Sequence, residues 1–264
     1  MAKSTYCYNN KKGDKDADNK DLIVLISNIY EYNKGYYGYR RIQAVLRFNG
    51  FKVNHKKVKR LMSKSNLYGK TVKKKYINYS SYKGTVGKIS DNLINRDFKA
   101  ISPNLKWTTD ITEFHIAAGK LYLSPILDMY NSEIICYVIS KSPNLLQVMT
   151  MLDKAFVKIP DNTNLIFHSD QGWQYQHKAY SSALTKKGIR QSMSRKGNCL
   201  DNSIMENFFG VLKREMFYGN ESSFTSLEHL EQAIVEYIDY YNTTRIKIKL
   251  GGLSPYQYSE SAGY

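Results

Sequence analysis

Three acidic residues lie in segments whose neighbours are largely apolar. Asp110 lies in an alternating predicted strand, Asp170 follows a short apolar strand, and Glu206 lies in a predicted helix among Met and Phe residues. An acid in such surroundings is costly unless it is paired, protonated or bound to metal. No nearby residue in the sequence neutralises these three, and 59 and 35 residues separate them in turn. We therefore examine them as one group.

Three converging carboxylates would suit a hard divalent cation, because Mg²⁺ prefers oxygen ligands. Two such ions about 3.5–4 Å apart would stabilise the attacking and leaving oxygens of a phosphodiester. The sequence therefore suggests Mg²⁺ or Mn²⁺, with two ions bound. Each acid alone also has a structural interpretation: Asp110 as a strand-end group, Asp170 as a turn residue, Glu206 as a helix-surface acid. A fourth acid, Asp201, is interpreted as a helix N-cap rather than a ligand.

The elements that must position these acids follow Trp107. Three strands at short intervals, TTDITEFHI, KLYLSPILDM and EIICYVIS, predict an antiparallel meander. A helix, a strand, a helix closed by Gly188, a further strand and two amphipathic helices follow, the first of them spelled DNSIMENFFGVLKREMF. This order predicts an α/β fold with a mixed sheet. Asp170 stands where a parallel strand ends, which is the usual place for sites in such sheets.

The N-terminal part has a different pattern, which predicts helices and no strands. Residues 21–66 predict three short helices, with Asp21 and Asn54 as N-caps and Asn49-Gly50 as a stop signal. Two helices around a glycine-containing turn, the second strongly basic, are typical of a helix-turn-helix.

The net charge is unevenly distributed along the chain. The net charge is +16 overall, but residues 1–106 carry +17 and residues 107–264 carry −1. A polyanion such as nucleic acid is the default partner of such a basic region. An anionic membrane surface and ribosomal-type RNA binding are the competing interpretations. The candidate DNA contacts are Arg40, Arg41, His55, Lys56, Lys57, Lys59, Arg60, Lys64, Lys73, Lys74 and Lys75, the last three in a basic linker.

Several classes of protein are disfavoured. No apolar run approaches the roughly 20 residues that span a bilayer, and no secretory signal is recognisable. Three distant cysteines predict neither a disulfide framework nor a metal clip, so we expect an intracellular setting. Tyrosine recombination requires an Arg/His-x-x-Arg cluster, and none of the five histidines has Arg at that spacing.

The motifs WTTDITEF, HSDQGWQY and SMSRKGNCLDNSIMENFFGVLKRE, with YGYRRI and VNHKKVKRLM upstream and LGGLSPYQY downstream, resemble those of a known family. This is the catalytic (OrfB-type) subunit of bacterial insertion-sequence transposases, in the Asp-Asp-Glu transposase and retroviral integrase superfamily. The resemblance covers roughly residues 20–258. It implies an RNase H-like core, a mixed five-stranded sheet flanked by helices, preceded by an all-α helix-turn-helix domain.

The resemblance also implies roles. Asp110, Asp170 and Glu206 would be the metal-binding catalytic triad, and Lys213 would be the basic residue seven positions after the Glu. The expected division is a leader at 1–20, a helix-turn-helix at 21–66, a linker at 67–100, a catalytic core at 101–220 and a helical extension at 221–264. Expected partners are element-end and target DNA, an upstream-frame subunit or frameshift fusion, and further copies of the chain. The expected location is the bacterial cytoplasm, at the nucleoid and not at a membrane.

Two other functions fit parts of the pattern. An RNase H-like nuclease shares the three acids but would not need the basic N-terminal arm. An inactive or domesticated DNA-binding protein would keep the arm, although the presence of all three acids disfavours decay of the site. The leading hypothesis is a transposase that cleaves element ends and then joins the 3′-hydroxyl to target DNA.

Overall fold

The computed structural model describes residues 19–69 and 87–264. These residues form two compact units, one of residues 19–69 with 247–252 and one of residues 87–246 with 253–264. Lys73, Lys74 and Lys75, predicted to contact DNA, lie outside the described residues, as does nearly all of the predicted leader.

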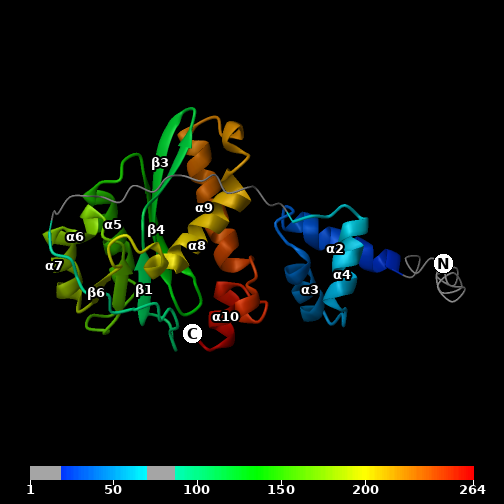
Figure 1. Ribbon diagram of the computed structural model, residues 1–264, viewed down its shortest axis with the longest axis horizontal. Helices are drawn as coiled ribbons and strands as arrows, with labels where there is room; N and C mark the ends of the chain where they lie inside the picture. Colours follow the sequence, from blue (N-terminus) through cyan, green and yellow to red (C-terminus); the bar gives the residue numbers. More distant parts are fainter. Residues whose placement is uncertain (1–18, 70–86) are drawn as a thin grey trace, which may run out of the picture. The chain divides into compact units, whose positions relative to one another are not determined.

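Three short helices make up most of the first unit: α2 (Lys20–Tyr32), α3 (Tyr39–Phe48) and α4 (His55–Lys64) (Figure 1). Asn54 caps α4 as predicted, because its side chain accepts a hydrogen bond from the Lys56 N–H at 2.8 Å. Asp21 does not cap α2, because the helix begins at Lys20 and its N-cap is Asn19. The core between the helices consists of Ile26, Ile42, Leu46, Val58, Leu61 and Met62.

The second unit is built on a mixed sheet of six strands. They are β1 (Lys106–Thr109), β2 (Thr112–Ile116), β3 (Gly119–Asp128), β4 (Ile134–Ser140), β5 (Ile166–Ser169) and β6 (Arg190–Met193). β1 and β2 pair antiparallel with the same edge of β3, and β4 pairs with its other edge. The predicted meander is therefore present, with its first strand broken in two. Across the sheet the strands occupy five positions, and β5 and β6 continue it in parallel from β1.

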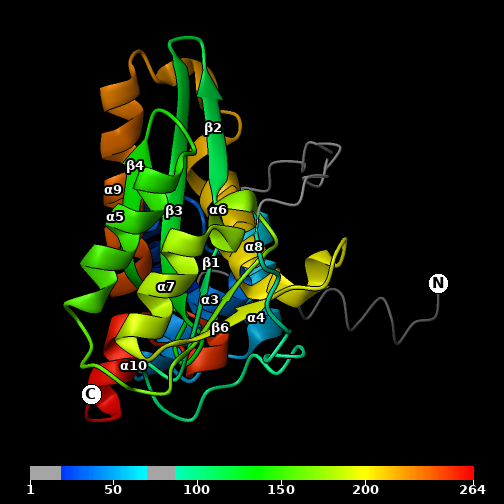
Figure 2. The same cartoon turned by 90° about the vertical axis from the view of Figure 1, so that its left-hand side faces the viewer.

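Helices cover both faces of this sheet, as Figures 1 and 2 show. One face carries α5 (Leu145–Phe156), α6 (Trp173–Gln176) and α7 (Lys178–Lys187). The other carries α8 (Ser203–Leu212), η3 (Lys213–Phe217) and α9 (Leu227–Thr243). The remaining short elements are η2 (Cys199–Asn202), η4 (Glu221–Ser223), η5 (Ile248–Leu250) and α10 (Pro255–Ser261).

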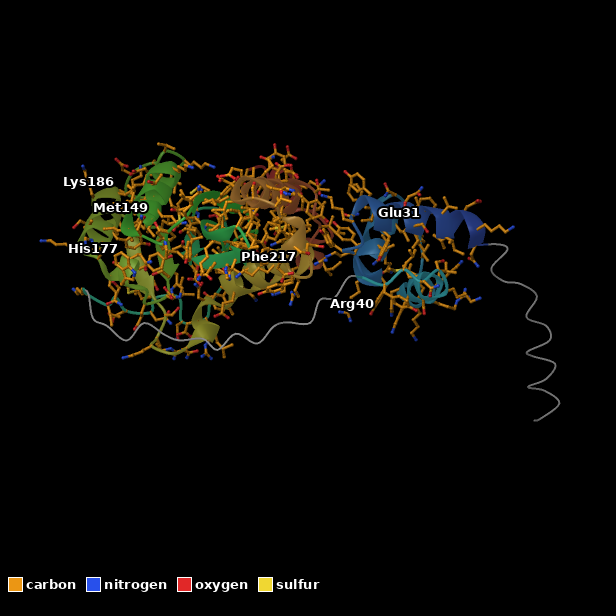
Figure 3. All side chains as sticks on the ribbon, turned by 90° about the horizontal axis from the view of Figure 1, so that it is seen from above. Glu31, Arg40, Met149, His177, Lys186 and Phe217 are labelled. Carbon is orange, nitrogen blue, oxygen red and sulfur yellow. The ribbon has the colours of Figure 1, made fainter. Side chains whose placement is uncertain are left out.

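Alternation along β3 divides the interior into two hydrophobic cores. Leu121, Leu123 and Leu127 face α8 and α9, whereas Ile126 faces α5. On the α8 side, Phe217, labelled in Figure 3, packs edge-on against Phe114 with ring centroids 5.1 Å apart. The helix α9 shares this core with the sheet, so it is part of the same compact unit.

The segment predicted as a single helix through Phe217 is three consecutive elements. A 3₁₀ turn, η2, precedes α8, and the helix then widens into the π-helical turn η3. Periodicity alone does not distinguish these helix types, because the apolar stripe continues through all three. π-turns inside helices are frequent at functional sites.

Candidate active site

Asp110 and Asp170 follow two neighbouring parallel strands at the same position. β1 pairs with β5 as Lys106 with Ile166, and so on through Thr108 with His168. Continuing this register by two residues places Asp110 beside Asp170, each directly after the last residue of its strand. Adjacent strands lie about 4.8 Å apart. The sheet therefore brings the two carboxylates together at its edge.

Burial, together with the proximity of the other acids, raises the pKa of Asp110 well above its ordinary value. Desolvation of its carboxyl is the largest cause, the charge of Asp170 the second, and the charge of Glu206 also contributes. The Ile111 N–H, which donates to Asp110 Oδ1 at 2.7 Å, and the charge of Lys213 oppose the shift. Asp170 and Glu206 are thus both within electrostatic range of Asp110.

The alternating sequence predicted that Asp110 lies inside a strand. In the structure it lies in a break between β1 and β2. The pairs Thr109–Ile126 and Thr112–Leu123 extrapolate to Asp110 opposite Pro125. Proline has no N–H to offer the ladder. The Pro125 carbonyl instead accepts a hydrogen bond from the Thr109 hydroxyl at 2.8 Å. The hydrogen-bond ladder with β3 is therefore interrupted at Asp110.

Asp170 is held by a tight local turn. Its Oδ1 accepts a hydrogen bond from the Gly172 N–H at 2.9 Å. A Cβ placed on Gly172 would lie only 3.0 Å from this oxygen and 3.3 Å from a ring carbon of Tyr175. Only glycine fits at this position without displacing one of these groups, so the glycine of the HSDQGWQY motif makes room for the carboxylate.

Glu206 lies one turn inside α8, and its side chain is exposed. The prediction that it sits among apolar side chains is wrong, because Met205 and Phe208 turn to the core while Glu206 turns away. The start of α8 is fastened to β1 by Asn202, which accepts from the Thr108 hydroxyl at 2.5 Å and donates to the Thr109 carbonyl at 3.2 Å. This attachment sets the distance from Glu206 to the end of β1.

Lys213 is the first residue of the π-turn η3. Its ammonium donates to the Glu113 carbonyl at 2.7 Å and lies 5.1 Å from the centroid of the Phe114 ring. Burial lowers the pKa of Lys213 to about 8, although the charges of Glu113 and Asp110 oppose the shift. A cation is therefore placed on the Asp110 side of η3, near the acidic group.

Asp201 has a role other than the predicted N-cap. It is fully buried, and its carboxylate forms ion pairs with Arg195 at 2.8 Å and Arg96 at 3.0 Å. It also accepts a hydrogen bond from the Asn92 side chain at 3.0 Å. The hydrogen bond from Arg195 is the main reason that its pKa lies well below the ordinary value. The predicted linker 67–100 is thus partly docked on the second unit, because Asn92 and Arg96 belong to it.

His168, singled out in the HSDQGWQY motif without a role, is a fully buried residue of β5. Its ring nitrogens lie 2.8 Å from the Ser192 hydroxyl and 3.1 Å from the Ser194 hydroxyl. Burial lowers its pKa to about 4, so the ring is neutral at pH 7. Gln171 reaches the Ser194 carbonyl at 3.0 Å. His168 thus links β5 to β6, and Gln171 links the Asp170 turn to the residue that follows β6.

The three acids form an all-oxygen donor set, which suits Mg²⁺ or Mn²⁺. After burial, the negative charges of Asp170 and then Glu206 raise the pKa of Asp110, and the charge of Lys213 opposes them. Within residues 19–69 and 87–264, no three Asp, Glu, His or Cys side chains are gathered closely enough to form a complete metal-binding group. The donor chemistry fits a divalent cation, while the side chains are not drawn together around one point.

Comparison with known proteins identifies the family. Residues 101–199 and 206–262 each match an integrase core domain, and residues 16–75 match an HTH-like domain. The chain is 47% identical over 258 residues to InsK of insertion sequence element IS150 from Escherichia coli (strain K12), covering 98% of this chain and 89% of that protein. The chain belongs to the insertion-sequence transposases.

A second relative and a solved structure are also similar to the chain over most of their own length. A transposase-like protein of Haemophilus influenzae is 55% identical over 78% of this chain and 93% of its own. A solved integrase catalytic core domain of HTLV-2 is similar to 60% of this chain and 98% of that chain, with a TM-score of 0.48 and 16% identity. The family's activity is DNA transposition. No helix in the described parts of this transposase is both long and apolar enough to cross a membrane.

The predicted DNA-contacting residues of α3 and α4 in the transposase lie on the first unit. All six basic residues of α4 are exposed, namely His55, Lys56, Lys57, Lys59, Arg60 and Lys64. Arg40, labelled in Figure 3, is exposed on α3, and Arg41 is half-buried with its guanidinium 5.4 Å from the centroid of the Tyr37 ring. Lys59 lies 5.8 Å from the Tyr39 ring. Two aromatic side chains, Tyr37 and Tyr39, thus lie beside basic residues of α3 and α4.

Sequence reasoning missed a buried network behind Lys213. Arg245 binds the Glu215 carboxylate, and the Tyr237 hydroxyl donates to the same carboxylate at 2.7 Å. In the sequence, Glu215 stands out only as the last residue of the motif SMSRKGNCLDNSIMENFFGVLKRE, with no role assigned to it. Nothing in the local sequence links it to Arg245, because 30 positions separate them and the pairing depends on how α9 packs.

Proposed function

We propose that the chain catalyses metal-dependent cleavage at the ends of an insertion sequence and the transfer of the resulting 3′-hydroxyl to target DNA. The observation that carries this proposal is the shared register of Asp110 and Asp170 across β1 and β5, with Glu206 within electrostatic range. Acids gathered on a protein whose substrate is anionic are unfavourable unless a cation joins them.

Asp110, Asp170 and Glu206 are the residues that would hold one or two Mg²⁺ or Mn²⁺ ions. Such ions, when bound, supply stabilisation of the charge on the oxygens of an in-line phosphoryl transfer. The residues of the chain do the positioning. Asn202 fixes α8 to β1, and Gly172 leaves space for the Asp170 carboxylate.

Lys213 would bind a DNA phosphate next to the acids. With a pKa of about 8, its ammonium remains mostly protonated at pH 7. Its anchoring to the Glu113 carbonyl limits where the charge can move. A lysine provides a compact point charge rather than a two-pronged contact, which suits a phosphate whose geometry changes during the reaction.

The same proposal assigns DNA binding to residues 21–66, a connecting role to 67–100, the chemistry to 101–220 and support of the core to 221–264. Arg40, Arg41 and the basic side chains of α4 would contact element-end DNA, mainly through phosphates. Lys73, Lys74 and Lys75 would extend this contact. The working assembly would contain several copies of the chain, with an upstream-frame subunit or fusion, in the bacterial cytoplasm.

The test is a comparison of Asp110→Asn, Asp170→Asn and Glu206→Gln with the unaltered chain on DNA that carries the element ends. We expect Mg²⁺-dependent cleavage and joining to fall by at least about a thousandfold, as expected for loss of several kcal/mol of transition-state stabilisation. DNA binding should remain. The matched control is Asp153→Asn, which changes an exposed acid on α5 and should leave both steps unchanged.

Full activity of Glu206→Gln would contradict the assignment of the three acids. Separate assays of cleavage and joining distinguish the remaining alternatives. Cleavage without joining would identify a nuclease, and DNA binding without either step would identify an inactive DNA-binding protein.

A further inference from the structure

Asp201 holds two arginines at once, and neither of them has a part in the proposed function. Arg195 donates to both oxygens of the buried Asp201 carboxylate, from Nε and from Nη2, each at 2.8 Å. Arg96 donates to Asp201 Oδ1 from Nε at 3.0 Å, and its Nη2 donates to the Asn198 side chain, also at 3.0 Å. One buried negative charge is therefore shared by two guanidinium groups, which leaves a surplus positive charge.

Both guanidinium groups reach the surface. The side chains of Arg96 and Arg195 are 45% and 52% exposed, whereas that of Asp201 is 0% exposed. A guanidinium has five N–H donors, and each arginine uses two of them in the hydrogen bonds above. Among the described contacts, three donors therefore remain on each. One cation is enough to neutralise a buried carboxylate, so the burial of Asp201 does not by itself explain the second arginine.

The backbone at Arg96 has an unusual conformation. Asn95 and Arg96 are the central residues of a tight turn, in which the Asp97 N–H donates to the Ile94 carbonyl at 2.8 Å, and their φ angles are 45° and 64°. Positive φ favours glycine or asparagine, and it costs other residues about 1–2 kcal/mol. The acid of the turn, Asp97, pairs with Lys106. The turn itself would favour glycine at position 96, so the arginine is explained by its side chain and not by its backbone.

The strand register places Arg195 at the end of the sheet that carries the acids. β5 pairs with β6 as far as Ser169 with Met193, and the next pair in this register is Asp170 with Ser194. The Ser194 N–H donates to the Ser169 carbonyl at 2.9 Å, which continues the pairing past the ends of both strands. Arg195 is the residue that follows.

Asp201 is connected to the same end of the sheet by a second path. The residue after it, Asn202, donates to the Thr109 carbonyl at 3.2 Å, and Thr109 directly precedes Asp110. The pair of arginines is therefore linked to Asp170 through β6 and to Asp110 through Asn202.

We propose that Arg96 and Arg195, oriented by Asp201, bind backbone phosphates of the DNA on which the acidic residues act. The proposal rests on the proposed function and adds a phosphate-binding group, besides Lys213, to the second unit. Guanidinium groups suit this role because their planar set of N–H donors matches two oxygens of a phosphate. Contacts to phosphates fix the position of DNA without reading its sequence.

Four substitutions test this role. Arg96→Gly removes one guanidinium and suits the positive φ of the turn, while Asn95→Gly relaxes the neighbouring position without changing the charge. Arg195→Gln removes the other guanidinium and leaves Asp201 paired with Arg96. Lys186→Gln, on α7, is the control for losing one positive charge elsewhere on the same unit.

The experiment uses the full chain with Asp110→Asn as the common background, without divalent cation, because this change lessens the repulsion between the acids and DNA. Fluorescence anisotropy over a salt series measures binding to an element-end duplex and to an unrelated duplex, and urea denaturation measures stability. For Arg96→Gly and Arg195→Gln we expect binding to both duplexes to weaken about fivefold, and the slope of log K against log salt to fall by about 1. For Asn95→Gly and Lys186→Gln we expect the slope of the background.

An unchanged slope in a folded Arg96→Gly chain would overturn the proposal, since the arginine would then serve only to pair with Asp201. If Arg96→Gly does not fold, the slope of Arg195→Gln decides in the same way. An equal fall in slope for Lys186→Gln, or a loss of binding confined to the element-end duplex, would also overturn it. None of these measurements requires cleavage or joining. A chain that joins no DNA would therefore contradict the proposed function while the slopes still decide the role of the two arginines.

Discussion

Arg245 and Glu215 form a buried, two-pronged ion pair with Nε–Oε2 and Nη2–Oε1 distances of 2.7 and 2.6 Å. The pair joins the π-turn that begins with Lys213 to the chain just beyond α9. The side chain of Arg245 is 3% exposed and that of Glu215 is 10% exposed. Arg245, just beyond α9, therefore supports the π-turn that carries the proposed phosphate-binding lysine.

Removing one partner of this pair should cost much more than removing both. We expect Arg245→Met to lower the free energy of unfolding by about 3–5 kcal/mol, because the Glu215 carboxylate is left buried without its cation. The double variant Arg245→Met/Glu215→Leu should recover part of that loss. Urea denaturation of the two variants measures the difference. A double variant less stable than the single one would show that the ion pair is not the source of the effect.

Gly172 offers a test of the space around Asp170. Gly172→Ala places a methyl group 3.0 Å from Asp170 Oδ1, so the carboxylate must move and DNA joining should fall by about 10–100-fold. The matched control is Gly210→Ala in α8, where no atom lies within 4 Å of the added Cβ. That change should leave activity intact and stabilise the helix by up to about 1 kcal/mol. Equal activity of the two variants would contradict the steric argument.

Asp128 predicts a specific pH dependence of stability. Burial raises its pKa from 3.8 to about 6, despite hydrogen bonds from Asn104, Tyr130 and Trp107. Between these values the folded chain binds more protons than the unfolded chain, so its contribution to the free energy of unfolding falls as the pH rises from about 4 to about 6, then levels off.

The comparison with Asp128→Asn isolates this contribution. The stability of the unaltered chain relative to the variant should be up to about 3 kcal/mol greater at pH 4 than at pH 7. Asp97→Asn is the control, because the pKa of this exposed acid is lowered, chiefly by its hydrogen bond from Lys106. Its dependence should have the opposite sign. A stability difference for Asp128→Asn that does not vary with pH would rule out the shifted carboxyl.

The exposed basic side chains of α4 lead to a prediction about salt. If Arg60 contacts a DNA phosphate, Arg60→Gln should weaken binding to all sequences and reduce the slope of log K against log salt by about 1. Lys186→Gln, which changes an exposed lysine on α7 (labelled in Figure 3), should leave the slope unchanged. Fluorescence anisotropy over a series of salt concentrations measures both. Equal slopes for Arg60→Gln and the unaltered chain would remove α4 from the interface.

The sequence by itself was sufficient for local features. The Asn54 cap, the end of α3 before Asn49 and the termination of α7 at Gly188 depend on hydrogen bonds and backbone angles within a few residues. The strands and their order along the chain were also predictable, apart from the break between β1 and β2, because alternation and apolar runs record which side chains are buried. The motifs that contain Asp110, Asp170 and Glu206 identified the family before any contact was known.

Only the tertiary structure decided how these pieces meet. The register of β1 against β5 places Asp110 beside Asp170, and Pro125 on a third strand interrupts the ladder there. The apolar surroundings predicted for Glu206 and the N-cap role predicted for Asp201 were wrong, because burial and pairing depend on how distant elements pack. Local periodicity describes one element at a time, whereas the geometry of a site is set by the packing between elements.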